Sequence, residues 1–159
     1  MAKYRLLSTD EFEELEKEFN DFLELNRITA DHWNLIKINY PENADRIIAL
    51  FSDVVFESIM RKAMYLEWRG MKELKVLQCL EDRFVIVGLE VSGVHEADLL
   101  NPEYLLESIK NPPSDLKTYT KEIKYLKPRE EEIFKMTEIG YSITNDKLFK
   151  TLCLILPSE

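Results

Sequence analysis

The feature that most constrains the fold of this chain is a change in the spacing of its apolar residues. In the first part of the chain they recur at intervals of three and four, as in Phe12, Leu15 and Phe19, which is the period of an α-helix. Three segments have this spacing: residues 9–25, 30–39 and 42–63. Farther along, apolar residues alternate with polar ones or run uninterrupted, as they do in β-strands. Four segments have that pattern: residues 65–69, 73–80, 83–91 and 116–126.

Capping residues and prolines predict where helices begin. Ser8 and Glu11 have the spacing of a capping box, and Thr29 is a suitable cap for the second helix. Pro128 opens another helix, which Gly140 would end. Two further helices are predicted to begin at Asn101–Pro102 and at Thr144 or Asn145.

These elements predict an α+β fold. We expect an N-terminal three-helix segment, a small, mostly antiparallel sheet of three to four strands, and C-terminal helices. Because no linker is long enough to divide the chain, we expect a single α+β domain over residues 1–159. Lysines in segment 116–126 suit an edge strand of the sheet.

The charge of the chain disfavours some partners. It has 21 lysines and arginines against 30 aspartates and glutamates, a formal net charge of −9. Such a surface repels phosphate backbones, so we do not expect nucleic-acid binding. One local basic patch is a candidate: Lys117, Lys121, Lys124, Lys127 and Arg129. Residues 1–25 hold eight acids against three bases, and this makes Glu13, Glu14 and Glu18 candidate interaction residues.

Location and thiol chemistry follow from composition. No apolar run is long enough to cross a membrane, and the N-terminal residues lack the apolar core of a signal peptide, so we expect no membrane insertion. A cytoplasmic location with reduced thiols is therefore expected. Cys79 and Cys153 stand in apolar surroundings, and we expect both to be buried rather than reactive.

Four common catalytic and phosphate-binding motifs are absent from the sequence, and the one match, Ser114-x-x-Lys117, follows two prolines and leads into a strand, so we expect it to arise by chance. GxGxxG, GxxxxGK[ST], GxSxG and HExxH are all missing. His95, Glu96 and Asp98 put three types of metal ligand in one loop. Neighbouring loop residues seldom enclose an ion without ligands from elsewhere, so a solvated loop is the expectation and a metal there is the open alternative. We expect no cofactor.

A polar strip interrupts the apolar helix predicted over 42–63. Asp53, Glu57 and Arg61 are four residues apart and therefore lie on one helical face. The simpler interpretation is a solvated face with one Glu–Arg pair, worth a few tenths of a kcal/mol. The alternative is an interaction or active-site strip. Five aromatic residues are expected to pack rather than to stack on bases: Tyr65, Trp68, Tyr119, Tyr125 and Tyr141.

Several blocks of the sequence together resemble a known family, and they are spread over nearly the whole chain. They are Lys3–Leu15, Glu18–Leu23, Ile28–Trp33, Phe51–Glu57, Lys62–Glu67, Ile133–Gly140, Ile143–Thr144 and Leu148–Lys150. The chain is similar to a family of short cytoplasmic proteins from Bacteroidetes that carries a domain-of-unknown-function label. This resemblance implies a bacterial, single-domain protein and carries over no catalytic residue or ligand.

Two main functional hypotheses remain. The first is a non-catalytic interaction protein or accessory subunit, which would bind an unidentified protein partner through its acidic N-terminal helix or its edge strand. The alternative is an enzyme or small-ligand-binding protein with a non-standard site around Asp53, Glu57 and His95. A third reading makes the acidic helix a mimic of nucleic acid. The sequence also leaves a homo-oligomer open.

Overall fold

The computed structural model describes residues 2–93 and 97–156 and divides the chain into two compact units. The first unit comprises Met1–Ile59 and the second Met60–Glu159. The expectation of a single domain stays a prediction, and each unit is described by itself.

Four helices form the first unit: α1 (Thr9–Glu14), α2 (Glu16–Leu25), α3 (Ala30–Asn39) and α4 (Pro41–Lys62), the last of which continues into the second unit. The prediction of one helix over 9–25 is wrong, because the helix is interrupted at Leu15, where φ is −105° and ψ is 20°. The apolar stripe continues across this interruption, so the spacing of the sequence does not show it. Both predicted caps are confirmed: Ser8 and Glu11 form a capping box, and the Thr29 side chain accepts a hydrogen bond from the His32 N–H.

Aromatic rings fill the core of the first unit. Phe19 is buried, and its ring lies 5.1 Å from that of Phe51, 5.2 Å from that of Trp33 and 4.8 Å from that of Phe12, centroid to centroid. The tilted and edge-on geometries are the favourable ones for such pairs. The helical spacing of these residues therefore serves packing among α1, α2, α3 and α4.

The second unit contains a five-stranded antiparallel sheet with the strand order β4-β3-β2-β1-β5. Its strands are β1 (Tyr65–Arg69), β2 (Glu73–Cys79), β3 (Arg83–Val91), β4 (Leu116–Lys124) and β5 (Ser142–Thr144). The expectation of three to four strands is therefore corrected to five. The additional strand, β5, has only three residues, too few for an alternating pattern to be recognised. It forms because β1 offers an edge, with Ile143 paired to Leu66.

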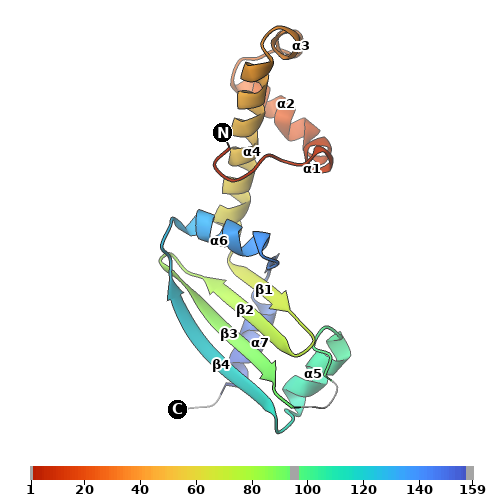
Figure 1. The fold of residues 1–159 in the computed structure, drawn as a ribbon, viewed down its shortest axis with the longest axis vertical. Coiled ribbons are helices and arrows are strands. Elements are labelled where there is room, and N and C mark those ends of the chain that lie inside the picture. The colour runs from red at the N-terminus through yellow and green to blue at the C-terminus, as the bar shows by residue number, and fades with distance from the viewer. Residues whose placement is uncertain (1, 94–96, 157–159) are drawn as a thin grey trace. The chain divides into compact units, whose positions relative to one another are not determined.

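Helices α5 (Pro102–Lys110) and α7 (Lys147–Leu154) lie against one face of the sheet (Figure 1). The core between the sheet and these two helices includes five fully buried residues: Leu74, Val76, Leu89, Leu99 and Leu152. The predicted cap of α5 is confirmed, with Asn101 accepting hydrogen bonds from two backbone N–H groups and Pro102 at the first turn. Helix α6 (Arg129–Glu138) lies at the end of the sheet where β2 turns into β3. The predicted starts of α5 and α6 agree with the structure.

The two cysteines differ from each other. Cys79 is buried on β2, as expected, but Cys153 on α7 is exposed, so the prediction for Cys153 is wrong. Of the two apolar neighbours of Cys153 in the sequence, only Leu152 is buried, whereas Leu154 is exposed like Cys153 itself. Among the described helices, none is long and apolar enough to cross a membrane.

Candidate functional site

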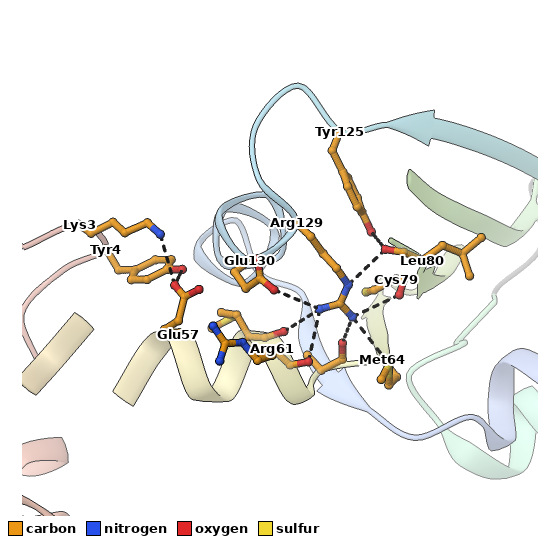
Figure 2. Close-up of polar contacts among 12 residues, drawn as sticks. Lys3, Tyr4, Glu57, Arg61, Met64, Cys79, Leu80, Tyr125, Arg129 and Glu130 are labelled. Carbon is orange, nitrogen blue, oxygen red and sulfur yellow. Dashed lines mark hydrogen bonds and ion pairs between the residues drawn. The ribbon is translucent and has the colours of Figure 1, made fainter. Parts of the chain in front are cut away.

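The predicted polar strip on α4 binds the N-terminal segment of its own chain. One carboxylate oxygen of Asp53 accepts hydrogen bonds from the backbone N–H groups of Lys3, at 2.8 Å, and Tyr4, at 3.1 Å. Glu57 accepts a short hydrogen bond from the Tyr4 hydroxyl and lies 3.3 Å from the Lys3 ammonium (Figure 2). The two carboxylates thus satisfy backbone donors and charges that the segment would otherwise expose to water.

A buried serine on α4 binds the N-terminal segment a few residues farther along. Ser52 is fully buried, its hydroxyl donates to the carbonyl of Ile48, and the Leu7 N–H donates to it at 3.2 Å. Just beyond, Arg5 donates two hydrogen bonds to Glu11, at 2.8 and 3.1 Å. The Arg5 hydrogen bond, together with that from the Ser8 backbone, lowers the pKa of Glu11 to about 2. The capping box therefore keeps its charge in mildly acidic solution.

The Asp53 contacts lead to a specific prediction. Replacing Asp53 by alanine is expected to reduce the free energy of unfolding by about 1–2 kcal/mol, because two backbone N–H groups lose a charged acceptor. Amide hydrogen exchange at Lys3 and Tyr4 should accelerate. Asp45→Ala is the matched control, since Asp45 is an exposed aspartate on the same helix. Unchanged exchange at Lys3 and Tyr4 in the Asp53 variant would contradict this assignment.

The other predicted residues are found at several places in the chain. Glu13 on α1 and Glu18 on α2 have exposed side chains, as does Glu14. Arg61 is exposed and belongs to the second unit. His95 and Glu96 lie outside the described residues, and Asp98 is half-buried. Over residues 2–93 and 97–156, no group of three histidines, cysteines, aspartates or glutamates is arranged to hold a metal ion.

The densest polar cluster of the second unit is one that sequence reasoning missed. The guanidinium of Arg129 donates to the carbonyls of Leu80, Met60 and Cys79, each at 3.2 Å, and to that of Ala63 (Figure 2). It joins the end of α4, the β2–β3 turn and α6. Only 14% of its side chain is exposed, so it does not belong to the predicted basic patch with the lysines of β4.

Two titratable neighbours of Arg129 are held neutral. Burial raises the pKa of the Cys79 thiol to about 12, although the charge of Arg129 acts in the opposite direction. Burial also raises the pKa of Tyr125, whose hydroxyl donates to the Leu80 carbonyl at 2.7 Å. A protonated thiol is a poor nucleophile, so Cys79 has a packing role here. We assign this cluster to stability.

The outer edge of β4 is an unpaired strand edge of the described sheet. β4 is the terminal strand of the sheet, paired only with β3, and spans nine residues, from Leu116 to Lys124. Its exposed side chains include Lys117, Lys121 and Lys124. Alternate residues of such a strand direct N–H and C=O groups away from the sheet, where another strand can bind them. The prediction of an edge strand in segment 116–126 is confirmed.

A line of side chains crosses the sheet from this edge, on the face opposite α5 and α7. Tyr119 on β4 donates to Glu73 on β2 at 2.9 Å, and Glu73 lies 3.5 Å from the ammonium of Lys75. That ammonium is 5.8 Å from the ring centroid of Trp68 on β1. Burial and the Glu73 hydrogen bond raise the pKa of Tyr119. We call these four residues the sheet-face cluster.

The sheet-face cluster depends on Gly88 of β3, which is paired with Tyr119. The tyrosine ring lies directly over this glycine, so that a Cβ added there would be 2.1 Å from the ring's Cζ. The sequence analysis expected Trp68 and Tyr119 to pack in the sheet, and these contacts fit that role. Their polar partners, Glu73 and Lys75, could not be paired from the sequence, because they lie on another strand.

Fold and site together describe an α+β protein: N-terminal helices, an antiparallel sheet whose longer terminal strand is β4, and C-terminal helices. A scan against protein-family models finds a match over residues 1–157, and the chain belongs to the family of unknown function DUF6495. No curated protein matches it, and no solved structure matches it. Membership in a family of unknown function fits the resemblance found in the sequence and assigns no activity.

Proposed function

We propose that this protein is a non-catalytic interaction module whose β4 edge binds an extended, acidic segment of a protein partner. The observation that carries the proposal is the nine-residue edge of β4, which is paired on one side only. Such an edge supports strand addition, in which backbone hydrogen bonds supply affinity and side-chain contacts supply specificity. The acidic residues Glu13, Glu14 and Glu18 remain a second, separately testable surface.

The charge of β4 indicates the chemistry of the partner. The strand carries three lysines against one glutamate, a net charge of +2, whereas the whole chain carries −9. The register puts Lys121 opposite Ile86 on one face, while Lys124 is opposite Arg83 on the other. An added strand would therefore meet positive charge on both of its faces, which favours aspartate and glutamate in the partner.

The lysines also limit which strands can pair. Charged side chains on edge strands oppose unspecific association, because a neutral strand would desolvate them without compensation. An acidic strand compensates them with opposite charges. The same residues therefore act against aggregation and in favour of one class of partner.

A peptide-display selection on the immobilised full-length chain tests the proposal. The recovered peptides are expected to be extended and enriched in aspartate or glutamate. Their affinity should fall about tenfold or more in the variant Lys121→Glu/Lys124→Glu, because each reversal replaces an attraction by a repulsion. These two lysines are preferred to Lys117, which lies opposite Glu90, so that reversing it would also destabilise the sheet.

The control is Lys135→Glu, which reverses an exposed lysine on α6 and should leave affinity unchanged. Binding should also slow amide exchange along β4 and weaken as salt is added. Selected peptides without acidic enrichment, or binding that survives the double reversal, would contradict the proposal.

Location and source are also proposals. We propose a cytoplasmic location, supported by two free cysteines, which are typical of reducing compartments. A source among the Bacteroidetes is supported only by the family resemblance noted in the sequence.

A further inference from the structure

A small groove lies between α5 and α7, in a different part of the second unit from the β4 edge. It has a volume of about 330 Å³, within the size range of small-molecule sites. Its apolar lining comes from Leu105, Leu106 and Ile109 of α5 and Leu148 of α7. Leu106 is 51% exposed, and so the groove presents an accessible apolar wall above the core.

Two cationic residues also line this groove. Arg69, at the end of β1, donates to Glu67 at 3.0 Å, but its Nε is buried and has no hydrogen-bond partner among the described residues. The rest of the guanidinium stays accessible, because 28% of the Arg69 side chain is exposed. Lys147, at the first turn of α7, is exposed and forms no ion pair with any described residue.

The balance of charge favours a monovalent anion. Glu67 neutralises Arg69, so the two cations and this carboxylate together leave a net charge of +1 at the groove. A carboxylate matches this charge and accepts two hydrogen bonds at once, one from the exposed part of the Arg69 guanidinium and one from the Lys147 ammonium. The two negative charges of a phosphate would exceed the net charge of +1 at the groove. The apolar walls call for a hydrocarbon chain attached to that carboxylate.

We propose that the groove between α5 and α7 binds a small amphiphilic carboxylate, with its hydrocarbon chain along Leu106 and Ile109 and its carboxylate toward Arg69 and Lys147. The site would serve as a ligand site of its own. It does not depend on the proposed strand addition, because the groove borders β1 whereas β4 is at the opposite end of the strand order.

Calorimetric titration of the full-length chain with decanoate tests this site. Decanoate is expected to bind saturably, whereas nonyltrimethylammonium, which has the same alkyl chain and the opposite charge, is not. Lys147→Gln should weaken decanoate binding about tenfold, the loss expected for one charged hydrogen bond. Leu106→Asp should abolish binding, because it puts a negative charge in the apolar wall.

Two matched variants separate the groove from general effects. Lys135→Gln removes an exposed lysine from α6, and Leu126→Asp changes a leucine that is 95% exposed outside the groove. Both should bind decanoate like the original chain. The amide spectra of all four variants verify folding. Failure of decanoate to bind, equal binding of the ammonium compound, or binding unaffected by both Lys147→Gln and Leu106→Asp would overturn the proposal.

Discussion

Replacing Arg129 by alanine is expected to lower the free energy of unfolding by roughly 3–5 kcal/mol, because several half-buried carbonyls lose a charged hydrogen-bond donor together. The guanidinium donates to the carbonyls of Met60, Ala63, Cys79 and Leu80. These acceptors would lose a charged donor where water has little access. Urea denaturation, followed by circular dichroism, measures the change.

Two further variants separate hydrogen bonding from charge. Arg129→Lys keeps the positive charge but has a single ammonium, which cannot reach the carbonyls at the end of α4 and those at the β2–β3 turn at once, so most of the loss should remain. Lys127→Ala, two residues earlier and exposed, should change the free energy of unfolding by less than about 0.5 kcal/mol. If Arg129→Lys were as stable as the original chain, charge alone would explain the role of Arg129, and the hydrogen-bond interpretation would be wrong.

The second large effect is expected at Gly88. Gly88→Ala should cost about 1–3 kcal/mol, the range for overpacking, because the new methyl group would lie 2.1 Å from Cζ of the Tyr119 ring. The ring must then move away, and its hydroxyl loses the 2.9 Å hydrogen bond to Glu73. Thermal unfolding of the full-length chain measures the change.

A double-mutant cycle isolates the cause of this effect. In the Tyr119→Ala background the ring is missing, so Gly88→Ala should cost nothing or become slightly stabilising, since alanine is favoured over glycine within a strand. An equal cost of Gly88→Ala in both backgrounds would show that the glycine is required for another reason.

Much of the local structure could be predicted because its causes are close together in the sequence. The Ser8–Glu11 capping box and the Asn101 cap of α5 are formed by residues within three positions of one another. The change from helical to strand spacing also gave the α+β class and the edge position of β4. By contrast, the interruption of the helix at Leu15 and the short strand β5 depend on packing and pairing with distant residues, and neither was predicted.

In the candidate sites, too, local features could be predicted from the sequence, whereas contacts between distant residues could not. The sequence put Asp53 and Glu57 on one helical face but could not show that Lys3 and Tyr4, about 50 residues earlier, bind them. Arg129 reaches the Met60 carbonyl across 69 residues, and the α5–α7 groove joins residues from three separate elements.

The sequence by itself determined where most helices and strands form, because periodicity and capping act over a few residues. Only the tertiary structure decided which polar groups meet and which edge and groove stay open. Those outcomes depend on the order and register of the strands, and no local pattern of residues encodes them.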